Sequence, residues 1–371
     1  MRLPVPSRVA PGGHRSRGVG RGRPSMRRGA ILGLGNVALH GHVPGWLGRS
    51  DVEIVAAADA RPAQRAECQA RLPGARWYDS PEALLTREQL DFVDICTPPS
   101  SHAPLILRAL DDGLHVLSEK PLVSSPDDLR RVAAAAQTAH RVLHTVHNWH
   151  HAPILSLTAE LIRAGEIGRV QRVAWETLRL RPAAAGDGRD GNWRVDPSVA
   201  GGGVLADHGW HVFYVVPAWI GARPSSVVAR LETRRHTAFA VEDTASVSLR
   251  FPAAAAEIFL TWAADERRNW VEVDGTEGRI ELHDDTLVLK GRSGERRWPG
   301  LPALSDGSHH PDWFHQVADR FLGAMAADAE GQDNLAEAAL CAAIEHEARE
   351  SSRRDGTERP IGPGLVVRAG A

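Results

Sequence analysis

The sequence predicts a two-domain α/β protein, in which a parallel sheet with intervening helices is followed by a β-rich second half. Three observations support this fold class. The chain has 371 residues, which is enough for two domains of ordinary size. In residues 28–148, short apolar runs alternate with helical patterns, as in β-α-β units. Between residues 170 and 290, short runs rich in β-forming residues are separated by turn residues.

The overall composition is typical of a soluble globular protein, with 43% hydrophobic and 24% charged residues. The odd number of cysteines, at distant and unpatterned positions, indicates neither a disulfide framework nor a zinc site with cysteine ligands. These cysteines are Cys68, Cys96 and Cys341. We therefore predict no metal and a reducing, cytoplasmic setting.

Charge is distributed unevenly along the chain. The formal net charge is −2, but residues 1–28 contain eight arginines and no acid, which leaves 36 basic against 46 acidic residues in the remainder. An acidic body argues against a nucleic-acid-binding domain. We predict that residues 1–27, rich in Gly, Pro and Ser, form a disordered basic extension. The sequence contains no run of about 18 apolar residues, the length that would predict a membrane span.

Arg27 and Arg28 precede an uncharged stretch, as they would in a twin-arginine export signal. That stretch is interrupted by Asn36, by histidines and by a proline. Its cleavage would also remove the glycine motif described next, so we expect the protein to stay in the cytoplasm.

A glycine motif follows the first apolar run. Residues 28–32 read as a short buried strand that leads into Gly33-x-Gly35-x-x-Ala38 and then a helix. The glycines allow a tight turn whose backbone N–H groups can approach a pyrophosphate, and Ala38 keeps the helix close to the strand. The predicted dinucleotide contacts in this turn are Gly33, Gly35, Asn36, Val37 and Ala38.

The end of the second strand indicates which dinucleotide binds. The apolar run that begins at Val52 ends at Asp59, 24 residues beyond Gly35. A carboxylate there can accept hydrogen bonds from both adenosine ribose hydroxyls and repels a 2′-phosphate, which favours NAD. Arg61 stands two residues later and can pair with a phosphate instead, so NADP is the alternative.

Two further predicted strands end in polar residues. They cover residues 90–96 and 114–118 and are separated by a helix over residues 102–112. Ligands of a parallel sheet bind at the carboxyl ends of its strands. We therefore expect the cofactor to be contacted by Thr97, Pro98, His102, Glu119 and Lys120.

Lys120 is unusual in this composition. The chain contains two lysines, Lys120 and Lys290, against 42 arginines. A lysine at a strand end beside the expected cofactor suggests a task that a guanidinium cannot perform. Proton transfer is such a task, because an ammonium group can be desolvated to a useful pKa and arginine cannot.

Four motifs in sequence order resemble the glucose-fructose oxidoreductase, inositol dehydrogenase and rhizopine-catabolism (Gfo/Idh/MocA) oxidoreductase family. They lie at residues 33–38, 97–102, 119–121 and 201–211. The resemblance implies a Rossmann NAD(P)-binding domain, here residues 28–148. It also implies a substrate-binding and oligomerisation α/β domain over residues 149–371, built on a large open, mostly antiparallel sheet.

Short β-rich runs support a sheet of this size. They cover residues 170–180, 226–231, 244–251, 257–262, 270–273, 279–282 and 286–289. An open sheet must cover its face or pair with another subunit. We therefore expect a homodimer or homotetramer that assembles through the C-terminal sheet.

The glycine triplet at residues 201–203 permits close backbone approach and precedes two polar residues. Asp207 and His211 are four apart, so they would project from one face of a helix. The resemblance implies that both are catalytic together with Lys120. His211 would relay the proton of the reacting hydroxyl, Lys120 would stabilise charge on that oxygen, and Asp207 would fix the sugar. His208 adds a His-x-x-His spacing, which alone does not predict zinc.

Further residues are predicted to line the pocket. Tyr214 lies seven residues after Asp207 and either hydrogen-bonds the substrate or packs in the core. The junction at residues 146–151 has histidines where many relatives have an arginine-phenylalanine pair, which leaves phosphate or carboxylate recognition there unsupported. We expect Asn148 to contact the cofactor. The predicted substrate contacts are Lys120, Trp149, Trp193, Arg194, Asp207, His211 and Tyr214.

We predict an NAD(P)-dependent oxidoreductase that transfers hydride between nicotinamide and a secondary alcohol or ketone of a sugar, cyclitol or glycoside. Two alternatives remain. One is a glycoside-cleaving enzyme of the same fold that retains its NAD, and the other is a non-catalytic dinucleotide-binding sensor. The glycoside-cleaving alternative would produce no net NADH from a sugar, unlike the predicted dehydrogenase. Sensors usually lack the catalytic groups that Lys120, Asp207 and His211 would supply.

Overall fold

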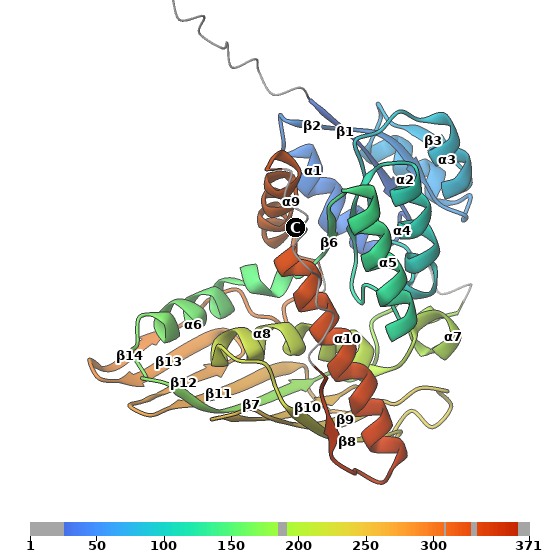
Figure 1. Cartoon of the computed structure of the whole chain (residues 1–371). Coiled ribbons are helices and arrows are strands. Elements are labelled where there is room, and N and C mark those ends of the chain that lie inside the picture. The colour runs from blue at the N-terminus through green and yellow to red at the C-terminus, as the bar shows by residue number, and fades with distance from the viewer. Residues whose placement is uncertain (1–25, 185–190, 308, 328–331, 363–371) are drawn as a thin grey trace, which may run out of the picture.

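The computed structural model describes residues 26–184, 191–307, 309–327 and 332–362, so nearly all of the predicted N-terminal extension lies outside the described residues. Two sheets organise the chain (Figure 1). One has six strands in the order β3-β2-β1-β4-β5-β6, and the other has nine in the order β14-β13-β12-β11-β7-β10-β9-β8-β15. The parallel first sheet and the mostly antiparallel second sheet confirm the predicted fold class.

All strand pairs of the first sheet are parallel. Its strands are β1 (Arg27–Leu32), β2 (Val52–Ala58), β3 (Arg76–Tyr78), β4 (Phe92–Ile95), β5 (His115–Ser118) and β6 (Leu143–Thr145). The helices between them are α1 (Val43–Leu47), α2 (Gln64–Arg71), α3 (Pro81–Arg87), α4 (His102–Asp111) and α5 (Pro126–Ala139). Helices cover such a sheet on both faces, which is why every residue of β4 is buried. The strand order reverses between β1 and β4, and ligands of parallel sheets bind at such a reversal.

The second sheet is antiparallel except where β7 pairs with β10. Its strands are β7 (Val170–Leu178), β8 (Ser226–Glu232), β9 (Thr244–Arg250), β10 (Ala255–Thr261), β11 (Arg268–Gly275), β12 (Arg279–His283), β13 (Thr286–Gly291), β14 (Gly294–Trp298) and β15 (Arg359–Pro360). Burial alternates along β7, where Val173, Trp175 and Thr177 are buried and Arg172 is exposed. One face therefore packs into the core, and the other carries charged pairs such as Arg172 with Asp274.

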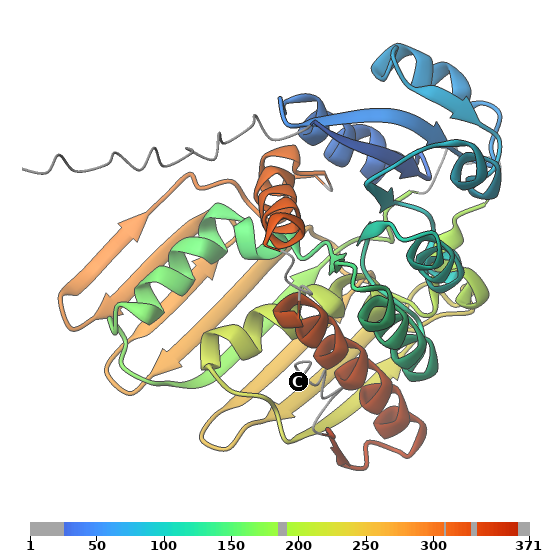
Figure 2. The same cartoon turned by 45° about the horizontal axis from the view of Figure 1, so that its top comes forward.

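Helices α6 (Pro153–Arg163), α8 (Trp210–Ile220) and α10 (Gln332–Arg353) lie on the buried face of the second sheet (Figure 1). The short α7 (Pro197–Ala200) precedes the glycine triplet. Helix α9 (Pro311–Ala326) instead lies beside α1 of the first sheet in both views (Figures 1 and 2). The ring of Phe314 fills the space that a Cβ at Gly45 would need. Helix α9 also packs against the junction helix η3 (Asn148–His151), so this C-terminal helix belongs to the core around the first sheet.

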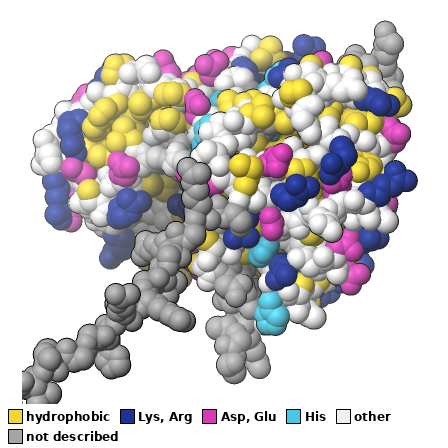
Figure 3. Space-filling model, turned by 90° about the horizontal axis from the view of Figure 1, so that it is seen from above, with side chains coloured by type: hydrophobic (Ala, Val, Ile, Leu, Met, Phe, Trp, Pro, Cys, Tyr) yellow, Lys and Arg dark blue, Asp and Glu magenta, His cyan; other side chains and the backbone are white. Residues whose placement is uncertain are grey.

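Within the described ranges, none of the helices combines the length and apolar character needed to cross a lipid bilayer. On the face that Figure 3 presents, basic and acidic side chains are interspersed over the described surface, with apolar side chains between them. Charge on that face is therefore mixed rather than of a single sign.

Candidate functional site

The glycine motif forms the turn between β1 and the π-helix η1 (Ala38–His42). Gly33 has a φ of +91°, and a Cβ there would lie 2.8 Å from the main-chain nitrogen of Thr97. Only glycine fits where the turn passes the end of β4. Gly35 is open by contrast, because a Cβ there would meet only the Arg61 guanidinium, at 3.9 Å. A narrow turn followed by an open position, with exposed Asn36 after it, fits the cradle of a dinucleotide pyrophosphate.

Asp59 ties this turn to the end of β2. One carboxylate oxygen accepts the Leu34 N–H at 2.8 Å, and the other accepts the Arg61 N–H at 2.8 Å. The Arg61 guanidinium also donates to both oxygens, at 3.0 and 2.9 Å. The carboxylate predicted to hold the adenosine ribose is therefore already paired with the cation that could hold a 2′-phosphate.

Lys120 and Asp207 come together between the two sheets. Lys120 follows β5, and Asp207 lies in the π-helix η5 (Leu205–Gly209) that leads into α8. The Lys120 Nζ donates to the main-chain oxygen of Asp207 at 2.8 Å and to its Oδ1 at 3.2 Å. The side chains are 16% and 20% exposed, so the pair is accessible from outside the core. An ammonium group has three N–H donors, and the described residues accept two of them.

The charges around this pair favour an ionised Asp207 and neutral histidines. Burial alone would raise the pKa of Asp207, but Lys120, His208 and Arg194 outweigh it and hold that pKa well below its usual value. Burial lowers the pKa of His208 to about 3, with the Arg179 and Lys120 charges acting in the same direction. Burial and the charge of Lys120 also lower the pKa of His211 well below its usual value.

His211 is oriented by Tyr214 and Trp149. The Nδ1 of His211 lies 2.9 Å from the Tyr214 hydroxyl, which also accepts the Trp149 main-chain N–H at 3.0 Å. Among the described residues, Nδ1 is the acceptor available to the hydroxyl proton. We therefore assign the O–H to Nδ1 and the imidazole proton to Nε2. The His211 ring stacks on Trp149 with centroids 4.3 Å apart.

Two predicted substrate contacts lie deeper than expected. Trp149 is 6% exposed and is stacked between His211 and Trp175, and Tyr214 is 1% exposed. Both side chains therefore support His211, because the ring surfaces with which they could contact a sugar are used in packing. Trp193 and Arg194 are half-buried, with the guanidinium 4.4 Å above the indole. The Nε of Arg194 has no partner among the described residues.

The predicted cofactor contacts also include both fully buried and partly exposed residues. His102 is fully buried, and its ring nitrogens lie 2.8 Å from the carbonyl oxygens of Thr97 and Pro121. The ring braces the loops after β4 and β5, which leaves neither nitrogen for a cofactor. Thr97 and Pro98 are partly exposed at the end of β4. The buried Oδ1 of Asn148 has no donor among the residues described, and a nicotinamide carboxamide could supply one.

The glycine triplet serves close packing between protein segments. A Cβ on Gly203 would overlap the main-chain oxygen of Glu242, and one on Gly202 would overlap the Arg349 guanidinium. The Gly203 and Leu205 N–H groups both donate to Glu242 Oε1, at 2.9 and 3.2 Å. This contact fixes the start of η5 and hence the position of Asp207.

Glu337 on α10 is a site residue that the sequence did not reveal. Its carboxylate lies 2.6 Å from His147 Nδ1 and 2.8 Å from His150 Nε2. The Trp210 indole N–H donates to His147 Nε2 at 3.1 Å, so His147 carries its proton on Nδ1 and donates it to Glu337. The junction histidines thus connect α10 to the segment that packs against His211. The unusual number of histidines at this junction was the signal in the sequence that an acidic partner exists.

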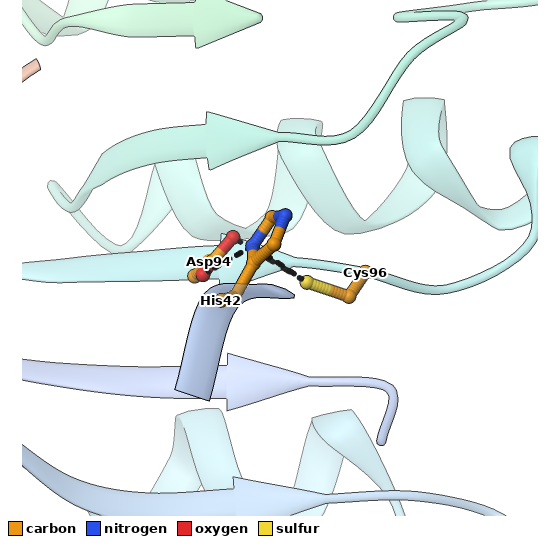
Figure 4. Close-up of side chains that lie close together, drawn as sticks. All are labelled: His42, Asp94 and Cys96. Atoms are coloured by element: carbon orange, nitrogen blue, oxygen red, sulfur yellow. Dashed lines mark hydrogen bonds and ion pairs between the residues drawn. The ribbon is translucent and has the colours of Figure 1, made fainter. Parts of the chain in front are cut away.

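A second unpredicted cluster is buried beside β4 (Figure 4). The donor atoms of His42, Asp94 and Cys96 lie within 4.8 Å of one another. The Nδ1 of His42 is 2.8 Å from Asp94 Oδ2 and 3.1 Å from Cys96 Sγ. The signal in the sequence was Asp94 itself, a charged residue inside an otherwise apolar strand.

Comparison with known proteins agrees with this architecture. Residues 27–147 match the oxidoreductase family profile with an NAD-binding Rossmann fold, and residues 156–281 match the GFO/IDH/MocA C-terminal domain. D-glucoside 3-dehydrogenase of Escherichia coli K12 is 32% identical over 192 residues, which is 51% of this chain and 52% of that relative. The match therefore spans about half of that protein. D-apiose dehydrogenase of Paraburkholderia graminis is 28% identical over 289 residues, 74% of this chain and 72% of the relative.

Solved structures share the fold. Levoglucosan dehydrogenase in complex with NADH aligns with a TM-score of 0.79 at 22% identity, over 91% of this chain and 99% of that one. An oxidoreductase domain protein from Kribbella flavida aligns with a TM-score of 0.75 at 23% identity, over 92% of this chain and 100% of that one. The two profile matches, which together cover most of the chain, show that it belongs to the Gfo/Idh/MocA oxidoreductase family, with an NAD-binding Rossmann fold and the family's C-terminal domain.

Proposed function

We propose that this protein transfers hydride between a nicotinamide cofactor and a secondary alcohol or ketone of a sugar, cyclitol or glycoside. The observation that carries the proposal is the Lys120–Asp207 pair, an accessible ammonium group with one N–H left for a ligand. The neighbouring charge of Lys120, together with burial, also lowers the pKa of His211. When bound, the nicotinamide accepts or supplies the hydride.

Each of the three polar residues has a distinct task. The remaining N–H of Lys120 donates to the reacting oxygen and stabilises the negative charge that develops there. Asp207 keeps the ammonium in place through Oδ1, and its Oδ2 can accept a sugar hydroxyl. His211 presents an N–H at Nε2, which donates to the reacting oxygen of a ketone.

Oxidation of an alcohol requires the other tautomer of His211. To accept the hydroxyl proton at Nε2, the ring must carry its own proton on Nδ1 and donate it to the Tyr214 oxygen. That oxygen has a second lone pair beside the one used by the Trp149 N–H. Rotation of the Tyr214 hydroxyl lets its oxygen pair with either tautomer, whereas the change of tautomer itself requires loss of a proton at Nε2 and uptake of one at Nδ1.

The cofactor preference follows from Asp59 and Arg61. An NAD ribose must share the Asp59 carboxylate with the Arg61 guanidinium. A 2′-phosphate would instead have to draw that guanidinium away from the carboxylate. We therefore propose NAD as the preferred cofactor and NADP as the weaker one.

A substrate panel tests the proposal. Inositols, aldoses, keto-sugars and glycosides are incubated with NAD or NADP, and reduced nicotinamide is followed by absorbance. Lys120→Ala should abolish turnover while NAD affinity changes by no more than a few-fold. Lys290→Ala is the matched control, because this second lysine pairs with Glu281 on the exposed face of the second sheet and should behave as wild type.

Three results would contradict the proposal. Turnover that survives Lys120→Ala removes this residue from the mechanism. Release of free sugar from a glycoside without net NADH indicates glycoside cleavage with a retained cofactor. Tight NAD binding without turnover of any panel member indicates a sensor.

A further inference from the structure

A buried polar cluster connects the first sheet to Lys120. Its centre is His42, at the end of η1, which is 2% exposed. The Nδ1 of His42 lies 2.8 Å from Asp94 Oδ2, and its Nε2 lies 3.0 Å from Glu119 Oε1. The Trp46 indole N–H also donates to Asp94 Oδ2, at 2.7 Å. Asp94 and Glu119 are 0% and 8% exposed, so water reaches neither carboxylate freely.

The geometry makes His42 a cation. Both of its ring nitrogens face carboxylates, which accept hydrogen bonds when ionised, so both nitrogens donate. Burial alone would lower the pKa of His42, but the Asp94 charge outweighs it and raises that pKa well above its usual value. Within the part of the chain that the structure describes, neither Asp94 nor Glu119 forms a side-chain ion pair with Lys or Arg. The imidazolium therefore offsets one of the two negative charges and donates a hydrogen bond to each carboxylate.

Glu119 transmits this constraint to Lys120. Its Oε1 accepts from His42, and its Oε2 accepts the Lys120 main-chain N–H at 2.9 Å. A carboxylate bonded at both oxygens cannot rotate without losing one partner. Lys120 is consequently held at two ends, at its backbone by Glu119 and at its Nζ by Asp207.

We propose that His42 is a positioning residue that sets the geometry of Lys120 through Glu119. The inference rests on the proposed function, in which Lys120 contacts the reacting oxygen. Without the imidazolium, Glu119 must take up a proton or turn toward another donor, and either change weakens its bond to the Lys120 N–H. Because His42 is buried away from the ligand positions, its loss should slow the chemical step and leave sugar and NAD affinity nearly unchanged.

The donor set of His42, Asp94 and Cys96 also suits a zinc-type cation, but the hydrogen bonds favour a proton. Asp94 accepts from His42, Trp46 and Cys96 together. None of the side-chain atoms of this cluster belongs to the buried polar atoms that lack a partner among the described residues. A metal ion would have to displace protons from an already satisfied network.

The two lysines of the chain allow a direct measurement of Lys120 that requires no substrate. The full-length protein is treated with limiting acetic anhydride over a range of pH, and acetylation of Lys120 relative to Lys290 is measured by peptide mass spectrometry. The variants are His42→Gln and the isosteric Glu119→Gln, which tests the same link if the first variant does not fold. Cys96→Ala is the control, because it removes a neighbour of His42 and leaves the His42–Glu119–Lys120 bonds in place.

Kinetics, cofactor affinity, thermal unfolding and metal content are measured on the same proteins. His42→Gln should raise the Lys120 to Lys290 labelling ratio about threefold or more and lower kcat about tenfold or more, as loss of a charge-assisted hydrogen bond predicts. KM and the Kd for NAD should stay within about twofold, because His42 is only 2% exposed and offers no surface to either ligand. Glu119→Gln should reproduce the rise in labelling, and Cys96→Ala should match the wild type.

Two outcomes would overturn the inference. A lower melting temperature with wild-type labelling and kcat would make His42 a purely structural residue. Stoichiometric zinc whose removal by a chelator changes Lys120 labelling would make the cluster a metal site. If the wild type turns over no sugar, the proposed function fails, while the labelling ratio still decides whether His42 controls Lys120.

Discussion

The hydroxyl of Tyr214 provides the most direct test of the geometry at His211. Tyr214→Phe deletes one oxygen and preserves the ring that stacks on His147 with centroids 4.3 Å apart. Two buried groups lose their partner, namely the Trp149 main-chain N–H and the Nδ1 of His211. The substitution therefore separates the hydrogen bonds of this residue from its packing.

The expected magnitude follows from these two groups. Each buried polar group left unsatisfied costs about 1–3 kcal/mol. The deleted oxygen leaves a space too small for a water molecule, so both groups stay unsatisfied. Because point substitutions that cost more than about 4 kcal/mol are exceptional, we take the lower part of the summed cost. We expect a loss of about 2–3 kcal/mol in the free energy of unfolding, or roughly 3–4 °C in melting temperature for a chain of 371 residues. Loss of the hydrogen bond that sets the His211 tautomer should lower kcat about tenfold, equivalent to about 1.4 kcal/mol.

Tyr78→Phe is the matched control, because Tyr78 is the second of the two tyrosines in the chain. Its hydroxyl donates to Glu88 at a partly exposed position, where a hydrogen bond contributes about 1 kcal/mol or less. Thermal unfolding followed by circular dichroism and steady-state kcat are measured for both variants. If the two variants unfold at the same temperature and Tyr214→Phe keeps the wild-type kcat, the assignment of the hydroxyl to His211 is refuted.

Other predictions concern the cofactor turn and α10. Asp59→Asn should shift the ratio of NAD to NADP affinity about tenfold toward NADP, because it removes the negative charge that repels a 2′-phosphate; an unchanged ratio in fluorescence titrations contradicts this. Gly33→Ala should cost at least about 1–3 kcal/mol and abolish NAD binding, because its Cβ would lie 2.8 Å from the Thr97 nitrogen; normal NAD affinity excludes this. Burial alone would raise the pKa of Glu337, but the hydrogen bonds from the two junction histidines outweigh it and hold that pKa well below its usual value. The carboxylate therefore stabilises the fold above its unfolded pKa of about 4.3 and loses this effect as pH falls. The difference in unfolding free energy between wild type and Glu337→Gln should shrink below about pH 5, and a difference that stays constant argues against the pairing.

Strand burial decided how much of the fold could be predicted. The strands β2 and β4 are mostly apolar, each with one acidic residue, because helices cover both faces of their sheet, and β7 of the second sheet alternates in burial. The three-residue β3 and the polar β14 carry no such pattern. They are edge strands that join through backbone hydrogen bonds, and these leave little trace in side-chain type.

The site was predictable where chemistry determines residue type and unpredictable where long-range packing does. The composition alone singled out Lys120, and the structure brings it to Asp207. Glu337, in contrast, reaches His147 across 190 residues, and no local pattern encodes that contact. The π-helix η5 adds a second difficulty, because residues four apart do not align in it as they do in an α-helix. The burial of Tyr214 therefore could not be derived from its spacing to Asp207.

The two anchors of Lys120 belong to different sheets, and this division determines what controls the amine. Glu119 holds the Lys120 backbone within the first sheet, whereas Asp207 holds its Nζ from the segment that leads into the second. A small displacement between the sheets would change the distance from Nζ to Asp207 and leave the Glu119 bond intact. On the first-sheet side, Phe314 of α9 fills the space beside Gly45 and stacks on His42 with centroids 4.1 Å apart, which helps to fix the charge network that holds Glu119. The position of the amine therefore depends on a buried charge network that fixes its backbone and on the segment carrying Asp207 that fixes its Nζ.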